Sequence, residues 1–404
     1  MKMMKIALLA TAAVAAVSVS ARADELSDLK AQIEALNNRM AVMETAPAVP
    51  AGYQLLSIGK GQASVVPGLE ADKDYGDTAT VISILPTADA PASTVVEITG
   101  FARAALVVRN DNWDPVVLAD LDGDGLVDDY VSGGGDEEVG VRSRGQVKIS
   151  GKTDTAIGEI GALMVLRANA GTGKAPGDVT SPEYWGYWAM TPELTLGGGY
   201  TGSLSGIGYG YDGKCNCYYT DNANAGYGHG DASQIRLSYA SGPIGFAIAL
   251  EDDGTDNLAD DDGALGVAAE VKYAGDMISG EVSAGWWNND GAGPDDAWQV
   301  AAGLGFNLDM FSISMSAGAF HGHADVDYWK ANILASVNMS DTIHAELGFN
   351  QVSSSDIADE SAVLAGIYYD PVSQLTIGLE AEWINPEGGS NDRTQVDLVT
   401  VYRF

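Results

Sequence analysis

From residue 95 to the C-terminus the sequence repeats one unit, a run of about ten residues of alternating polarity followed by a connection. In residues 141–149 the small and apolar side chains take the odd positions, whereas Arg142, Arg144 and Lys148 take even ones. Residues 374–383 alternate in the same way. Because successive side chains of a strand point to opposite faces, each run predicts a strand with one polar and one apolar face.

The connections between these runs alternate in length. Long acidic connections, such as 110–138 and 203–230, are followed by tight turns, such as 191–192 and 370–371. Short inner turns, long outer loops and an even number of strands are typical of bacterial transmembrane barrels. The sequence therefore predicts an all-β protein, a transmembrane antiparallel β-barrel of about 16 strands over residues 95–404. The expected strands are 95–109, 139–151, 155–169, 183–190, 193–202, 231–241, 243–251, 264–274, 276–288, 296–307, 309–320, 326–338, 341–351, 361–370, 373–385 and 393–404.

Aromatic side chains recur near the ends of the predicted strands. Their amphipathic rings suit the two membrane interfaces, so we expect them to form outward-facing girdles. The residues concerned are Trp185, Tyr187, Trp188, Trp286, Trp287, Trp298, Tyr328, Trp329, Tyr368 and Trp383.

The N-terminus predicts a secretory signal peptide over residues 1–23. It has a basic start with Lys2 and Lys5, an apolar run over 6–19 and a cleavage site of the small-x-small type at 21–23. The alternative is an apolar N-terminal helix that packs in a protein core.

Residues 24–46 predict a short coiled-coil helix that precedes the barrel. Its apolar side chains fall at alternating steps of three and four, and prolines follow at 47 and 50. Three heptads are marginal alone, so we expect this stalk to self-associate rather than pack on its own chain. Residues 47–94 are expected to form a linker or a small periplasmic segment, to which the sequence assigns no fold. The heptad positions are Leu26, Leu29, Ile33, Leu36, Met40 and Met43.

Charge and composition exclude several classes of protein. The chain has 56 acidic and 21 basic side chains, a formal net charge of −35, whereas nucleic acid requires clustered Lys and Arg. After the signal peptide no stretch approaches the roughly 20 consecutive apolar residues of a membrane helix. Cys215 and Cys217 are too few for a disulfide scaffold and either bridge or stay reduced. His321 and His323 share one strand face, which favours polar wall residues over a metal site.

The C-terminal strand carries a family resemblance. Phe404 ends the chain, and Val396, Leu398 and Tyr402 share its face. Tyr402 and Phe404 resemble the C-terminal signal that the barrel-assembly machinery reads in outer-membrane proteins. Together with the heptad stalk, this strand makes the chain similar to the alphaproteobacterial outer-membrane porins, although residues 51–94 are an addition to the simplest of these.

The resemblance implies a homotrimer of 16-stranded barrels, each a water-filled channel for passive diffusion of ions and small hydrophilic solutes. It would lie in a Gram-negative outer membrane, in contact with lipid and lipopolysaccharide, with its stalk in the periplasm. An alternative is an envelope tether, whose coiled coil links the membrane to peptidoglycan. The sequence shows no recognisable Ser-His-Asp grouping, so we do not expect the protein to be an enzyme.

The resemblance also implies that the third external loop folds into the lumen and narrows it. Here that loop is 203–230, with Asp212 and Asp221 as its acidic residues, and an ordinary external loop is the alternative. Opposite it we expect a basic wall, which sets a transverse field or merely hydrates the lumen. The acidic outer loops favour a modest preference for cations. The basic wall consists of Arg103, Arg109, Arg142, Arg144, Lys148 and Arg167.

The first long connection contains the start of a calcium-binding loop. Carboxylates stand at its positions one, three, five and nine, and a glycine stands at position six. The usual glutamate at position twelve is missing, because Val131 stands there. The prediction is Ca²⁺ in this loop, against a merely solvated acidic loop, and we expect no required cofactor. The candidate ligands are Asp120, Asp122, Asp124, Leu126, Asp128 and Asp129.

Overall fold

The computed structural model describes the strands and most of the tight turns of this chain. The described residues are 55–69, 74–85, 94–111, 137–170, 179–207, 217–220, 230–252, 265–288, 296–322, 327–354, 359–386 and 392–404. The expected signal peptide and the expected coiled coil lie outside them. Among the described residues, no helix has the length and apolar character required to cross a membrane.

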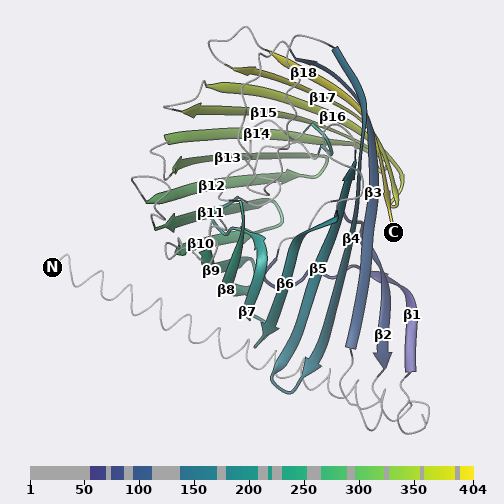
Figure 1. The fold of residues 1–404 in the computed structure, drawn as a ribbon, viewed down its shortest axis with the longest axis vertical. Coiled ribbons are helices and arrows are strands. Elements are labelled where there is room, and N and C mark those ends of the chain that lie inside the picture. The colour runs from purple at the N-terminus through teal and green to yellow at the C-terminus, as the bar shows by residue number, and fades with distance from the viewer. Residues whose placement is uncertain are drawn as a thin grey trace, which may run out of the picture. The chain divides into compact units, whose positions relative to one another are not determined.

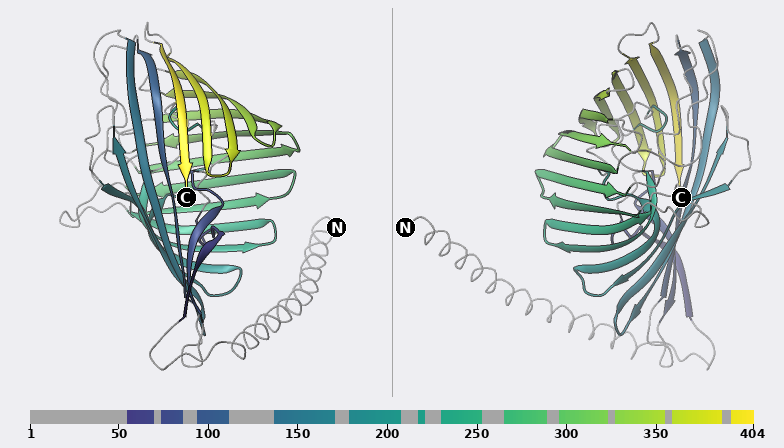
Figure 2. Two further views of the ribbon diagram at one scale, coloured as in Figure 1. Left: turned by 90° about the vertical axis from the view of Figure 1, so that its right-hand side faces the viewer. Right: turned by 60° about the vertical axis from the view of Figure 1, so that its left-hand side comes forward.

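Sixteen antiparallel strands, β3 to β18, form a closed barrel in which each strand pairs with the next along the chain (Figure 1). The barrel closes where β18 pairs with β3, in a register that runs from Arg393 opposite Asp111 to Arg403 opposite Phe101 (Figure 2). The prediction of an all-β barrel with about 16 strands is confirmed. The strands are β3 Thr94–Asp111, β4 Glu137–Thr155, β5 Gly158–Ala170, β6 Val179–Ala189, β7 Leu194–Gly202, β8 Asp231–Ser241, β9 Ile244–Asp252, β10 Leu265–Ala274, β11 Ile278–Trp287, β12 Ala297–Leu308, β13 Phe311–His321, β14 Asp327–Ser340, β15 Ile343–Ser354, β16 Glu360–Val372, β17 Leu375–Pro386 and β18 Arg393–Arg403.

The two faces of the barrel wall differ in polarity as the alternating pattern predicts. Large apolar side chains point outward, among them Leu379, which is 50% exposed, and Val300, which is 45% exposed. Polar side chains such as Glu380 and Gln395 alternate with them on the inner face and are fully buried. An apolar outer surface with a polar interior is the arrangement of a barrel that spans a bilayer.

The expectation of outward-facing aromatic girdles holds for only part of the aromatic set. Trp286, Trp298, Trp329 and Trp383 are exposed on the outer face, but Trp185, Tyr187, Trp287 and Tyr368 are buried on the inner one. The physical reason is the period of the strand, because neighbours such as Trp286 and Trp287 must point to opposite faces. Glycine makes room inside, since a Cβ on Gly266 would overlap the indole of Trp287.

Two further strands precede the barrel and were not assigned from the sequence. They are β1 Leu55–Gln62 and β2 Thr78–Leu85, which pair with each other. Residues 58–82 of this hairpin belong to the same compact unit as the barrel.

We predict that Leu379→Arg, in the middle of β17 on the outer face, lowers the free energy of unfolding in lipid by about 2–4 kcal/mol, because it places a charge among lipid chains. Denaturant titration in liposomes measures this difference. The matched control is His344→Arg, whose side chain lines the interior, and its effect should be small. Equal effects at the two positions would mean that the outer face does not meet lipid.

Candidate channel lumen

The six predicted basic-wall residues all lie on the inner face of β3, β4 and β5. Arg103 and Arg109 are buried, while Arg142, Arg144 and Lys148 alternate with outward side chains on β4. Polar neighbours on the wall fix two of the guanidinium groups. Arg144 Nε donates to Asn169 Oδ1 at 2.8 Å, and Arg167 Nε donates to Gln146 Oε1 at 2.8 Å.

The inner face also carries carboxylates, which the sequence analysis did not include among the site residues. They lie mostly on the part of the barrel that β9 to β18 form, and all are buried. These carboxylates alternate with apolar side chains along each strand, and this pattern in the sequence is the signal that places them on the inner face. One of these carboxylates, Glu97, lies on β3, and the others are Glu251, Glu281, Glu346, Glu380, Glu382 and Asp397.

The loop between β7 and β8 enters the lumen at residues 203–207. The Ser203 hydroxyl and the Leu204 N–H donate to the carboxylate of Glu251, at 2.6 and 2.9 Å. The Ser205 carbonyl accepts from Ser283 Oγ at 2.7 Å and from Gln299 Nε2 at 2.6 Å. These bonds bind the loop to the inner face of β9, β11 and β12.

The same loop reaches another part of the wall at residues 217–220. The Glu380 carboxylate on β17 accepts the N–H groups of Tyr218, Tyr219 and Thr220 at 2.6, 3.0 and 3.2 Å. Gln395 Nε2 on β18 donates to the Tyr219 carbonyl at 3.2 Å. One buried carboxylate thus accepts hydrogen bonds from three successive backbone N–H groups. Hydrogen bonds to a charged group are stronger than those between neutral groups. Since β17 and β18 lie far from β9 to β12 around the barrel, the loop has contacts on two well-separated parts of the wall.

The two tyrosines of this segment are buried and uncharged. Burial raises the pKa of the Tyr218 phenol, although the nearby Arg403 opposes the shift. Burial likewise raises the pKa of the Tyr219 phenol, against the opposing effect of Arg103. Both phenols therefore stay protonated at neutral pH and act through hydrogen bonds. The Tyr219 hydroxyl donates to the Arg103 carbonyl at 3.2 Å.

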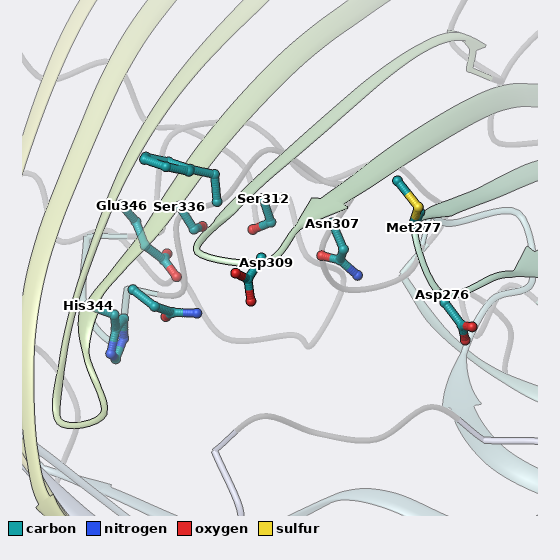
Figure 3. Close-up of a pocket in the computed structure, with 10 residues that line it drawn as sticks. Asp276, Met277, Asn307, Asp309, Ser312, Ser336, His344 and Glu346 are labelled. Carbon is teal, nitrogen blue, oxygen red and sulfur yellow. The ribbon is translucent and has the colours of Figure 1, made fainter.

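A cavity of about 620 Å³ lies against the ends of β11 to β15 that carry the tight turns (Figure 3). Asp309, His344 and Glu346 are among the side chains that line it. His344 Nδ1 lies 3.1 Å from Asp370 Oδ2 on the next strand. The remaining lining residues are Asp276, Met277, Asn307, Phe311, Ser312, Ser336 and Asn338.

Several predicted site residues lie outside the described part of the chain. These are the six candidate calcium ligands of residues 120–129 and the loop acids Asp212 and Asp221. Within the described ranges no cluster of three or more His, Cys, Asp or Glu side chains is placed to hold a metal ion. Cys217 takes part in a disulfide. His321 Nδ1 lies 2.7 Å from Asp327 Oδ1 at the end of β13.

No protein-family model and no curated protein matches the sequence. Solved structures do match in fold. An anion-selective porin from Comamonas acidovorans has a TM-score of 0.55 at 10% identity, over 77% of this chain and 100% of that chain. Salmonella typhi OmpF, in complex with daunomycin, has a TM-score of 0.55 at 13% identity, over 77% and 98%. A loop L8 deletion mutant of OmpT, an outer membrane protein of Vibrio cholerae, has a TM-score of 0.53 at 13% identity, over 77% and 99%. The chain shares the porin barrel fold.

We predict that Glu380→Ala speeds hydrogen exchange at the amides of Tyr218, Tyr219 and Thr220 by about tenfold or more, because a bond to a charged group contributes about 1.5–3 kcal/mol. Exchange mass spectrometry on the folded barrel measures the rates. Glu281→Ala serves as the control, since its carboxylate lies 3.8 Å from Lys272 on another part of the wall. Unchanged exchange in Glu380→Ala would show that this carboxylate does not anchor the loop.

Proposed function

We propose that the barrel is an outer-membrane channel for the passive diffusion of ions and small hydrophilic solutes. The observation that carries the proposal is the polar inner wall, crossed by a loop whose backbone is bound to Glu251 and Glu380. A closed barrel with an apolar outside gives a water-filled passage wherever its interior is polar and not filled. The fold shared with porins supports the same function.

The test is the flux of neutral solutes into liposomes that contain the purified barrel. Small sugars should enter at rates that fall steeply with size, and large oligosaccharides should be excluded. The control is a liposome with the same lipid and no protein. Swelling rates equal to the control for every sugar would refute the channel. Swelling rates that do not depend on the size of the sugar would show that the channel has no constriction.

The β7–β8 loop narrows this channel in our proposal, and its hydrogen bonds to the wall at residues 203–205 and 218–220 support that role. The basic side chains on β3 to β5 and the carboxylates on β9 to β18 then give the lumen a transverse field, which orients polar solutes as they pass. Asp212 and Asp221 stay predictions as acidic members of this loop. The proposed Ca²⁺ in the first external loop also stays a prediction.

We further propose a homotrimer in a Gram-negative outer membrane and membership of the alphaproteobacterial porins. The heptads of residues 24–46 and the C-terminal aromatic residues support these assignments. Gel migration of the unheated protein, with and without residues 24–46, tests the trimer.

We predict that the double change Arg142→Gln with Arg144→Gln raises the permeability ratio of K⁺ to Cl⁻ by about twofold, because it removes positive charge from the lumen wall. Reversal potentials across a KCl gradient in a planar bilayer measure the ratio. Lys60→Gln, on the exposed β1–β2 hairpin, removes one charge outside the barrel wall and should have little effect. A fall in the ratio, or no change, would contradict the proposed basic wall.

A further inference from the structure

The described residues of the connection between β1 and β2 lie against the inner face of the barrel. We define the inserted segment as residues 63–69 and 74–77, the described parts of this connection. The Ala63 N–H donates to the Asp77 carbonyl at 2.9 Å, which closes the hairpin where the segment leaves it. In the bonds given below, the described residues between these two positions contact inward-facing side chains of the barrel wall.

The first half of the segment docks on the inner face of β3, β5 and β6. Ser64 donates from both its N–H and its hydroxyl to the Glu97 carboxylate, at 2.8 and 2.6 Å. Val66 is buried in an apolar cluster on the lumen wall, and Leu69 packs against the same cluster. Burial of a valine side chain stabilises a structure by about 1.5–3 kcal/mol, so the contact of Val66 holds the segment against the wall. The other members of the cluster are Leu163, Val165, Trp185 and Tyr187.

Gly68 adopts a left-handed backbone conformation, and its carbonyl group points toward β8. Gly68 has a φ of +84°. Its carbonyl accepts a hydrogen bond from Arg236 Nη1 at 2.6 Å. The guanidinium also lies over the ring of Trp185, 5.3 Å from its centroid. The inserted segment thus binds Arg236, an inward-facing arginine that is not one of the six predicted basic-wall residues.

The second half covers two residues of the basic wall, Arg103 and Lys148. Asp74 Oδ2 lies 2.7 Å from Arg103 Nη1, in an ion pair whose side chains are only 13% and 5% exposed. Tyr75 is buried, and Lys148 Nζ lies 4.5 Å from the centroid of its ring. Gln146 Nε2 donates to the Tyr75 hydroxyl at 2.6 Å. A buried ion pair of this kind holds its partners strongly, because loss of either leaves an uncompensated charge.

Two arginines connect the inserted segment to the β7–β8 loop. Arg103 pairs with Asp74 and lies over the ring of Tyr219, 4.9 Å from its centroid. Arg403 Nε donates to the Asp74 carbonyl at 3.1 Å, and its Nη2 donates to the Tyr218 hydroxyl at 2.6 Å. Tyr75, Tyr218 and Tyr219 belong to one buried cluster. The segment and the loop, which enter from opposite ends of the barrel, therefore meet inside it.

The open cavity of the lumen lies on a different part of the wall from the inserted segment. The inserted segment occupies the lumen along β3 to β6, β8 and β18, whereas the cavity of about 620 Å³ lies along β11 to β15. That cavity is lined by Asp276, Asp309 and Glu346, and neither Lys nor Arg is among the described residues that line it. Basic groups are thus covered where the segment docks, and acidic groups face the open space.

We infer that the inserted segment is a fixed plug at the end of the channel that carries the tight turns. It covers Arg103, Lys148 and Arg236 and leaves permeating ions to pass along the acidic side, so that it makes the channel select cations. The inference rests on the proposed function, because a plug has a measurable effect only in a channel. It assigns to residues 64–69 and 74–76, the described residues between Ala63 and Asp77, the role that sets both conductance and the sign of selectivity.

The experiment replaces residues 64–76 with Asn-Gly, the two-residue turn that suits a hairpin closed at Ala63 and Asp77. The expected result is a rise in single-channel conductance of about twofold or more, since the lumen widens. The permeability ratio of K⁺ to Cl⁻ should fall by about twofold or more, because Arg103, Lys148 and Arg236 become exposed to the ions. Conductance and selectivity equal to those of the full chain would overturn the inference and leave the channel standing.

A second variant decides the question even if the hairpin variant does not fold. Asp74→Asn leaves the length of the segment unchanged and removes the negative charge that compensates Arg103, so the K⁺ to Cl⁻ ratio should fall. Asp77→Asn removes the same charge from an exposed position of the same hairpin and should leave the ratio unchanged. Equal ratios in Asp74→Asn and the full chain would contradict the inference. Absence of conductance in the full chain and in all three variants would instead refute the proposed function, and the inference with it.

Discussion

Hydrocarbon offers no hydrogen-bond partners, and this constraint governs the structure. A chain that spans a bilayer with strands must pair every backbone N–H and C=O with a neighbouring strand, and only a closed barrel leaves no edge. Here the pairing of β18 with β3 provides that closure. Closure also creates an interior, and the strand period then dictates that every second side chain faces it. The apolar outer face and the polar lumen follow from one constraint.

Polar groups inside the barrel face the same requirement in a different form. Two chain segments enter the lumen with backbone groups that no strand satisfies, and wall side chains satisfy them instead. Glu380 and Glu251 accept backbone N–H groups of the β7–β8 loop, while Arg236 and Arg403 donate to backbone carbonyls of the inserted segment. Buried polar groups are costly unless they are paired, so these side chains determine where each segment lies. The charges of the wall thus act first as anchors, and the charges left uncovered set the field in the lumen.

Much of the barrel could be predicted from the sequence because its information is local. Alternation over a run such as 141–149 shows which side chains face inward. All six basic-wall residues lie on the inner face of the barrel. Long and short connections likewise indicate the strand order without any distant contact. The aromatic set was predicted less well, because a position near a strand end does not tell which face Trp286 or Trp287 takes.

The inserted segment could not be predicted because its partners are distant in the sequence. Asp74 pairs with Arg103, and Gly68 with Arg236, yet nothing in the composition of residues 63–77 indicates these contacts. The runs at β1 and β2 are short, and a lone hairpin is marginally stable in water, so they gave no secure strand signal. The acid anchors were visible as polar positions, but only the folded chain shows that Glu380 binds the backbone of the β7–β8 loop.

In a channel of this kind, water and ions pass along the inner face of the barrel and lipid covers the outer face. Cysteines at two neighbouring positions of β14 test it most directly, Ser336→Cys beside the cavity and Ala335→Cys on the outer face. A charged, membrane-impermeant thiol reagent is added while single-channel current is recorded in a planar bilayer. We predict that the reagent lowers the current of Ser336→Cys and leaves that of Ala335→Cys unchanged. An equal response at both positions, or a response at Ala335→Cys alone, would contradict it.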